Sequence, residues 1–263
     1  MNASISILNN GLRTLAAAAA IAVAGAAHAA SAAPAGAQPS VVIVHGAFAD
    51  GSDWAKVIPL LQAKGIKVTA VQNSLTSLAD DVAAAQRAID NQPGKVVLVG
   101  HSWGGTVITE AGAGDKVAAL VYVAAFAPDA GQATSDLGKD LPPAPGITKL
   151  AVDKAGFASL PPAVLKEDFA QDVPAAQAAV MAATQGPIAV KAFDDKTTVA
   201  AWRKHPSWYI VSKNDRMIQP DLERRFAKTI GAETTELAAS HVPQQSRPAD
   251  VAKVILDAVA ASK

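Results

Sequence analysis

A short, glycine-flanked serine motif is the part of this sequence best suited to chemistry. Residues 100–105 read Gly-His-Ser-Trp-Gly-Gly and directly follow the apolar run Lys-Val-Val-Leu-Val at residues 95–99. A serine between a buried strand and a helix of small residues can occupy a strained turn, with its hydroxyl projecting above the sheet. The glycines let strand and helix pack closely. This context predicts that Ser102 is a nucleophile rather than a helix-capping serine.

Such a serine needs a general base, because a hydroxyl is a poor nucleophile at neutral pH. Among five histidines, His241 lies in the stretch Ala-Ser-His-Val-Pro, after the last predicted strand and before the last predicted helix. A loop at the carboxyl end of a strand can bring its imidazole to Ser102. His241 is therefore the predicted base, and a structural surface histidine is the alternative.

The imidazole in turn requires a buried carboxylate that fixes its tautomer and stabilises its positive charge. Asp215 follows the strand-like residues 208–212 in a Lys-Asn-Asp-Arg turn and is the predicted acid. The alternative for Asp215 is an Asx-turn residue that pairs with Arg216. Asp129, after the fourth predicted strand, ranks below Asp215 because its Pro and Gly neighbours suit a turn.

The oxyanion of an acyl-transfer reaction needs preorganised N–H donors. The backbone N–H of Trp103, which follows the nucleophile, is one expected donor. The loop His-Gly-Ala-Phe at residues 45–48 is expected to supply the other from Ala47, with Phe48 next in rank. A plain strand-to-helix turn is the alternative for this loop. The side chains of Phe48 and Trp103 are also expected to line the substrate pocket, although aromatic residues there are as often core.

These residues need a scaffold that holds the ends of several strands at one edge. From residue 39 onward, apolar β-branched runs alternate with helix-like segments, which is typical of a parallel sheet covered on both faces. Six strands are predicted, at residues 40–44, 66–71, 95–99, 116–125, 208–212 and 234–238. Helices are predicted at residues 52–64, 78–91, 105–111, 175–184, 221–230 and 250–261.

The alternation breaks in a proline-rich stretch between residues 126 and 205, which contains short helical patches. This stretch is too long for an ordinary loop in a compact domain. We predict a helical cap, at about residues 128–205, inserted over the carboxyl ends of the strands, where open α/β sheets bind ligands. A flexible linker is less favoured, because sheet-forming segments resume after it.

Composition limits the classes of partner. The 263 residues are 50% hydrophobic, which suits a single α/β domain, residues 30–263, with one insertion. Lys and Arg number 23, as do Asp and Glu, so neither nucleic acid nor an anionic membrane is an expected partner. The chain has no cysteine, which excludes disulfides, thiol nucleophiles and thiolate-bound metals.

Residues 1–29 are predicted to be a signal peptide. Arg13 precedes an apolar stretch at residues 15–27, and Ala-His-Ala at residues 27–29 forms an A-x-A cleavage site. The stretch is too short and too rich in alanine for a comfortable membrane span, so no stable membrane insertion is expected. Export to a periplasm or to the medium is predicted, and a disordered alanine-rich leader is the alternative.

With these residues placed, the chain from about residue 39 onward resembles the α/β-hydrolase superfamily. It is most similar to the group of small esterases that includes methylesterases and hydroxynitrile lyases. The resemblance is carried by residues 45–48 with Trp54, residues 100–105, Asp215 in its Asn-Asp-Arg turn, and Ser-His-Val at residues 240–242. It implies an α/β-hydrolase fold and serine-dependent chemistry that needs no metal or organic cofactor. These motifs do not fix a substrate.

Two positions distinguish the lyases of that group from its esterases. The lyases of this kind carry a Lys directly after the catalytic His and a Thr where this chain has Gly46. Here Val242 follows His241, so no ammonium is present to stabilise a departing cyanide, and the esterase pattern is kept. The dehalogenase branch has an Asp at the position that Ser102 holds.

Together these features predict the hydrolysis of small, neutral, fairly hydrophobic carboxylic esters through an acyl-enzyme. In this scheme His241 takes the proton of Ser102, the N–H groups of Ala47 and Trp103 hold the oxyanion, and water releases the acyl group. A hydroxynitrile-type lyase or a C–C bond hydrolase on the same triad is the second hypothesis. A non-catalytic ligand binder is the third.

Overall fold

A six-stranded parallel sheet forms the centre of the computed structural model, which describes residues 38–263. The predicted signal peptide lies outside the described residues. The strand order is β2-β1-β3-β4-β8-β9, and every neighbouring pair is parallel. The strands are β1 (Ser40–Val44), β2 (Val68–Val71), β3 (Val96–His101), β4 (Val117–Val123), β8 (Ser207–Ser212) and β9 (Glu233–Leu237). All six predicted strands are therefore confirmed, each to within two residues at either end.

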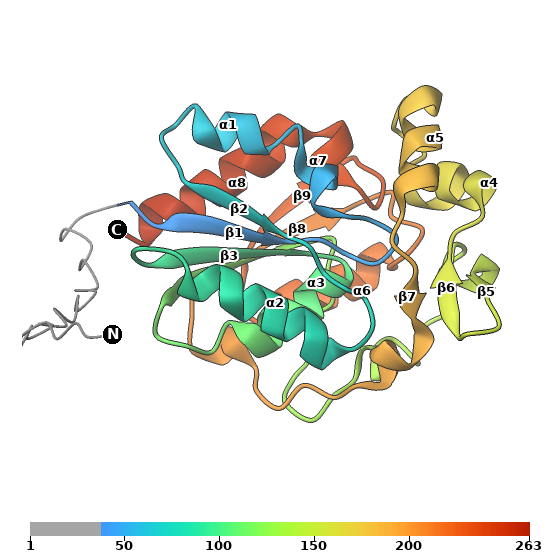
Figure 1. Ribbon diagram of the computed structural model, residues 1–263, viewed down its shortest axis with the longest axis horizontal. Coiled ribbons are helices and arrows are strands. Elements are labelled where there is room, and N and C mark those ends of the chain that lie inside the picture. Colours follow the sequence, from blue (N-terminus) through green and yellow to red (C-terminus); the bar gives the residue numbers. More distant parts are fainter. Residues whose placement is uncertain (1–37) are drawn as a thin grey trace, which may run out of the picture. The chain divides into compact units, whose positions relative to one another are not determined.

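Helices cover both faces of the sheet (Figure 1). They are α1 (Ile58–Gln62), α2 (Leu78–Asp90), α3 (Trp103–Ala111), α6 (Pro220–Thr229), α7 (Pro243–Ser246) and α8 (Pro248–Ala261). Successive side chains of a strand point to opposite faces. In β1, Val41 and Ile43 pack in a core with residues of α8, whereas Val42 and Val44 pack in a second core with residues of α2, α3 and α6. Both faces of the central strands are thus buried, as their continuous apolar sequences predict, whereas the edge strands β2 and β9 are partly exposed.

The helix predicted at residues 52–64 differs from the observed structure. A 3-10 turn, η1 (Gly51–Trp54), precedes the shorter α1. Pro59 is the second residue of α1, where its missing N–H is tolerated, but it cannot bond to the turn before it. The proline therefore divides this segment. Helix α3 also begins at Trp103, two residues earlier than predicted.

The predicted cap lies between β4 and β8, beside one end of the sheet (Figure 1). Its helices are α4 (Pro162–Val164) and α5 (Ala175–Thr184). The π-helical turn η4 (Leu165–Phe169) joins them, and the 3-10 turns of the cap are η2 (Thr134–Asp136), η3 (Ile147–Lys149), η5 (Val190–Asp194) and η6 (Ala201–Arg203). The cap also contains an antiparallel sheet of β5 (Ala151–Val152), β6 (Phe157–Ser159) and β7 (Ile188–Ala189), which the sequence analysis did not predict. Strands of two or three residues are too short to show an alternating pattern.

Helix α3 packs unusually close to the loop after β1. A Cβ atom placed on Gly104 would lie 2.4 Å from the carbonyl oxygen of Val44 and 2.9 Å from that of His45. Any residue larger than glycine would therefore push α3 away from the sheet. Because Ser102 stands at the start of α3, this contact sets the height of its hydroxyl above the strands.

We expect Gly104→Ala to lower the free energy of unfolding by about 1–3 kcal/mol, because the added methyl group meets backbone atoms in a packed interface. At an unhindered helical site the same change would stabilise the protein by about 0.5–1 kcal/mol, so the sign is diagnostic. Gly114→Ala is the control, since a Cβ there meets nothing within 4 Å. Urea unfolding measures both variants, and equal midpoints for the two would contradict the close-packing account.

Candidate active site

Ser102 occupies a strained turn between β3 and α3. Its backbone has φ 52° and ψ −121°. Residues other than glycine rarely adopt a positive φ. The turn is held by hydrogen bonds from Ser102 N–H to the carbonyl of Val123 at 3.2 Å and from Gly105 N–H to the carbonyl of Ser102 at 2.9 Å. The side chain is thereby lifted off the end of the sheet.

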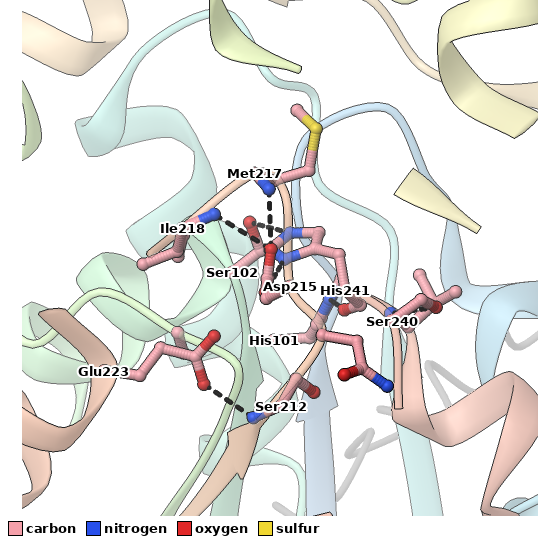
Figure 2. A network of polar contacts seen from close by, with 12 residues as sticks. His101, Ser102, Ser212, Asp215, Met217, Ile218, Glu223, Ser240 and His241 are labelled. Carbon is pink, nitrogen blue, oxygen red and sulfur yellow. Dashed lines mark hydrogen bonds and ion pairs between the residues drawn. The ribbon is translucent and has the colours of Figure 1, made fainter. Parts of the chain in front are cut away.

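His241 and Asp215 meet Ser102 at this edge (Figure 2). Nε2 of His241 lies 2.8 Å from Ser102 Oγ, and Nδ1 lies 2.5 Å from Asp215 Oδ2. All three residues are buried. A carboxylate at Nδ1 keeps the ring proton there, which leaves Nε2 free to accept a hydrogen bond from the serine hydroxyl. The structure thus brings together the three side chains that the sequence analysis selected.

The turn around Asp215 combines the two interpretations considered from sequence. Oδ1 of Asp215 accepts hydrogen bonds from the N–H groups of Met217 at 2.6 Å and Ile218 at 2.9 Å, which is Asx-turn geometry. Its other oxygen contacts His241. Arg216 does not pair with Asp215 and bonds to Asp168 instead. The Asx turn therefore orients the carboxylate toward the imidazole.

Asp129, the second candidate acid, is engaged elsewhere. Its Oδ1 accepts a hydrogen bond from Nε of Arg203 at 2.9 Å, and the two side chains form an ion pair. Hydrogen bonding to Arg203 lowers the pKa of Asp129. The carboxylate partner of His241 is Asp215, so the ranking of the two acids agrees with the observed contacts.

Two more histidines support this site without joining the chain of hydrogen bonds. His101 donates through Nε2 to the backbone carbonyl of His241 at 2.8 Å. Nε2 of His45 accepts from the N–H of Asn73 at 2.9 Å, and its Nδ1 donates to the carbonyl of Gly46 at 2.8 Å. Burial lowers the pKa of both rings, and the nearby imidazole of His241 lowers that of His101 further. Both are neutral at pH 7 and fix the backbone of the two loops.

The loop after β1 lies close against Ser102. A Cβ on Gly46 would lie 2.8 Å from Cβ of Ser102, so glycine allows this approach. The N–H of Phe48 donates to the carbonyl of Gly186 at 3.1 Å and is therefore occupied. Within residues 38–263, the N–H groups of Ala47 and Trp103 donate to no protein acceptor. Both N–H groups therefore remain available to a ligand beside Ser102.

A cavity of about 470 Å³ opens beside Ser102 and His241. Most of its lining is apolar and comes from the cap and the turn before α6, and Phe48 and Trp103 belong to the lining as predicted. The other apolar residues are Ala47, Phe126, Leu137, Leu141, Pro143, Ala144, Ile147, Leu150, Phe193, Met217, Ile218 and Leu222. The Trp103 indole is also part of the core, because it is fully buried and its Nε1 donates to Asp81 at 2.8 Å.

Each of the other polar side chains of this lining already has a partner within the protein. Thr134 bonds to Thr106 at 2.7 Å, and Ser135 donates to Asp194 at 2.7 Å. Lys139 donates to Asp136 at 2.9 Å, and Gln219 donates to the carbonyl of Pro142. Apart from Ser102, His241 and the two backbone N–H groups, the cavity therefore offers a ligand mainly apolar contact.

A cap segment at residues 168–172, here termed the clamp, contacts both the Asp215 turn and the His241 loop. Asp168 is fully buried and bonds to Lys149 at 2.7 Å and to Arg216 at 2.5 Å. The Phe169 ring packs against the His241 ring, with centroids 5.0 Å apart. Nε2 of Gln171 donates a hydrogen bond to the carbonyl of Asn214 at 2.6 Å. Oδ2 of Asp172 accepts one from the N–H of Ser240 at 2.8 Å.

Sequence reasoning missed the clamp and most of the cavity lining. Phe169 and the apolar residues of the 134–150 segment stand in short turns, where no helical or strand period marks a buried face. The only available signal was the position of the whole insertion. Within residues 38–263 no group of three or more His, Asp or Glu side chains is arranged to hold a metal ion. That same part of the chain contains no helix with the length and apolar character needed to span a membrane.

Comparison with known families agrees with this architecture. A family model described as "Alpha/beta hydrolase family" matches residues 41–254, and the chain belongs to this family. Among solved structures, polyneuridine aldehyde esterase superposes with a TM-score of 0.75 at 21% identity, covering 84% of this chain and 99% of that one. A pyrethroid hydrolase from Sphingobium faniae superposes with a TM-score of 0.71 at 21% identity, covering 85% and 98%. These two likenesses concern the fold.

Proteins with similar sequences include a probable hydrolase and plant proteins, among them methylesterases. "Probable hydrolase R7" of Phoma sp. is 26% identical over 246 residues, which are 84% of this chain and 98% of that protein. Salicylic acid-binding protein 2 of Nicotiana tabacum is 37% identical over 103 residues, and Methylesterase 8 of Arabidopsis thaliana is 35% identical over 104. These two matches span 34% of this chain and about two fifths of each plant protein. The chain is thus an α/β hydrolase similar to the small esterases.

The clamp predicts that Asp168→Ala lowers the free energy of unfolding by about 1–3 kcal/mol, because two charge-assisted hydrogen bonds are lost. The substitution should also lower kcat/KM for an ester substrate, because Arg216 adjoins Asp215 and its release would loosen the turn that holds the Asp215 carboxylate against His241. Burial alone would raise the pKa of Asp168, but hydrogen bonds from Lys149 and Arg216 outweigh it and lower the pKa. The stabilisation is therefore present at neutral pH and is lost as the pH falls through that lowered pKa.

Urea unfolding at neutral and acidic pH tests this expectation, with Asp257→Ala as the control. Asp257 forms an exposed pair with Lys253 on α8, and such a pair contributes about 0–1 kcal/mol. A loss for Asp168→Ala no larger than for Asp257→Ala, or one that does not shrink in acid, would contradict the role given to the clamp.

Proposed function

We propose that this protein is a serine-dependent carboxylic ester hydrolase. The observation that carries the proposal is the unbroken chain of hydrogen bonds from Asp215 through His241 to Ser102, at the wall of an apolar cavity. Ser102 is the nucleophile, His241 the general base and Asp215 the group that orients the imidazole. The backbone N–H groups of Ala47 and Trp103 are the oxyanion donors.

In the first step, the hydroxyl proton of Ser102 moves to Nε2 of His241 while Oγ bonds to the ester carbonyl carbon. The carbonyl oxygen becomes an oxyanion between the N–H groups of Ala47 and Trp103. When the oxyanion collapses, the carbon–alkoxide bond breaks and the alcohol departs with the proton held at Nε2. Asp215 stabilises the imidazolium that exists between these two proton transfers.

In the second step, water takes the place of the alcohol. His241 removes a proton from the water as its oxygen attacks the acyl-enzyme carbonyl, and the same two N–H groups stabilise the new oxyanion. Collapse breaks the bond to Ser102 Oγ, which recovers its proton from His241. The carboxylic acid then leaves and the resting hydrogen bonds re-form.

The cavity supports neutral, fairly hydrophobic small-molecule esters as substrates. Its apolar lining favours the burial of hydrocarbon groups, and the carboxylate of a charged ester would lose water on entering it. The one charged side chain of the lining other than His241, Lys139, is already paired with Asp136. A volume of about 470 Å³ lies within the range of small-molecule sites. The printed names of similar proteins, among them methylesterases, an aldehyde esterase and a pyrethroid hydrolase, also support ester chemistry.

Cyanohydrin cleavage is the less favoured alternative. Val242, which follows His241, is apolar and fully buried, so no cation reaches the site from that position. We therefore expect an ester such as p-nitrophenyl acetate to be turned over and a cyanohydrin not to be. We also propose that residues 1–29 direct export, which a comparison of the amino terminus of the protein in cells and in medium would test.

Ser102→Ala is expected to abolish covalent labelling by a fluorophosphonate probe and to reduce ester hydrolysis by about 10⁴-fold or more, because it removes the attacking oxygen. Ser135→Ala is the matched control, since Ser135 lines the same cavity but its hydroxyl is bonded to Asp194. In-gel fluorescence and p-nitrophenyl ester hydrolysis give the two measurements. Undiminished labelling of Ser102→Ala would exclude Ser102 as the nucleophile.

The cavity also predicts a preference among acyl groups. From p-nitrophenyl acetate to butyrate to hexanoate, kcat/KM should rise by up to about fourfold per CH₂, the equivalent of about 0.8 kcal/mol. The negatively charged p-nitrophenyl hemisuccinate should be hydrolysed at least about tenfold less efficiently than a neutral ester of similar length, because its carboxylate would be desolvated. Rates without enzyme correct for intrinsic reactivity. A charged ester that reacts as well as the neutral one would contradict the proposed specificity.

A further inference from the structure

A second carboxyl group lies behind the acid of the triad. Glu223, in the first turn of α6, is fully buried, and its Oε2 accepts a hydrogen bond from the N–H of Ser212 at 2.8 Å (Figure 2). Ser212 ends β8, the strand that leads into the Asp215 turn. The Glu223 carboxyl is also within hydrogen-bonding reach of the Asp215 carboxyl. None of the steps described above uses Glu223.

The two carboxyl groups have unequal sets of hydrogen-bond donors. Asp215 accepts from Met217 N–H, Ile218 N–H and His241 Nδ1. Glu223 accepts from one backbone N–H, and its Oε1 is buried without any donor among the described residues. Two carboxylates in contact within a dry interior do not both ionise, and the better-solvated group keeps the negative charge. By this criterion the charge belongs to Asp215 and the shared proton to Glu223.

We propose that Glu223 is a neutral carboxylic acid at physiological pH, that its Oε1 donates a hydrogen bond to Asp215, and that it thereby positions the acid of the triad. The proton that Glu223 carries explains why Oε1 lacks a donor, since in this form Oε1 is itself the donor. Glu223 touches neither substrate nor Ser102, so it is a positioning residue. Its effect on catalysis rests on the proposed function, whereas its protonation does not.

The surrounding charges agree with a neutral Glu223. Burial, followed by the negative charge of Asp215, raises the pKa of Glu223 well above its usual value. Tyr209 on β8 is neutral, because burial raises the pKa of its phenol. Arg224 is the nearby cation on α6, but its guanidinium is partly exposed and is bonded to Glu236 and Asp221.

A neutral acid at this place has two consequences. A donor from Glu223 gives Asp215 a fourth hydrogen bond and ties the first turn of α6 to the loop that carries the triad acid. It also keeps a second negative charge away from the imidazole of His241. Ionisation of Glu223 at alkaline pH would add that charge, break the bond to Asp215 and loosen the turn.

Infrared difference spectroscopy of the full chain tests the proposal without any substrate. A protonated carboxyl absorbs at a higher frequency than a carboxylate, and ¹³C-glutamate labelling shifts the bands of Glu but not those of Asp. At pH 8 we expect a protonated Glu band in the wild type, absent in Glu223→Gln and retained in Glu233→Gln, whose side chain is exposed. Absence of the band in the folded wild type would overturn the proposal, even if no variant folds.

Two further variants identify the acceptor. The frequency of the Glu band should change in Asp215→Asn and stay in place in Ser212→Ala, whose hydroxyl is the other buried oxygen near Glu223 without a partner. The opposite pattern would overturn the bond to Asp215. Asp53→Asn serves as a control, because Asp53 is a second carboxyl whose pKa is raised by burial, and isotope labelling separates its band from that of Glu223.

Kinetics then separates positioning from a general loss of structure. Glu223→Gln retains an N–H donor and should keep kcat within about threefold of the wild type, whereas Glu223→Leu, which cannot donate, should lower kcat at least about tenfold with little change in KM. Glu223→Gln should also resist alkaline inactivation better than the wild type. Equal kcat values for the Gln and Leu variants would overturn the positioning role. If the wild-type protein hydrolyses no ester at all, the proposed function is refuted, whereas the infrared result on Glu223 is unaffected.

Discussion

The imidazole of His241 has to be held between two oxygen atoms, and most of the surrounding structure serves that requirement. A ring that accepts a proton at Nε2 is effective only if its Nδ1 proton is fixed and its positive charge is balanced. Asp215 meets both needs, because its carboxylate lies 2.5 Å from Nδ1 and its side chain is fully buried. The position of Ser102 is equally constrained, because its backbone is strained and α3 packs directly against the loop after β1.

The parallel sheet makes this convergence possible. Ser102, Asp215 and His241 follow β3, β8 and β9, whose carboxyl ends lie at one edge of the sheet. Loops at that edge meet in space although they are far apart in the chain. The cap completes the arrangement, because the clamp at residues 168–172 contacts both the Asp215 turn and the His241 loop while other parts of the insertion line the cavity. The cap therefore supports both the cavity and the loops that carry Asp215 and His241.

Local chemistry explains why so much of this could be predicted from the sequence. A buried parallel strand is a continuous apolar run, and a serine between glycines after such a run has few other uses. The six strands and the meeting of Ser102, Asp215 and His241 follow from those patterns. Glu223 could not be recognised in the same way, because it stands in the charged stretch Asp-Leu-Glu-Arg-Arg, where an exposed face is the ordinary expectation. Its burial depends on how α6 packs on β8, which is a tertiary property.

The cap was predicted as an insertion but not in its details. The strands of its antiparallel sheet have two or three residues, which is too short for an alternating pattern. Asp168 becomes a buried ion-pair partner only when Lys149 and Arg216 converge on it. The signal peptide predicted at residues 1–29 remains a prediction.

Mass spectrometry of the protein, stopped with acid during turnover of a slowly deacylating ester, tests the central claim most directly. We predict an intact mass increased by the mass of the acyl group less one hydrogen atom, with the adduct confined to the peptide that contains Ser102. A protein that turns over the ester with no adduct, or with the acyl group on another residue, would contradict the account.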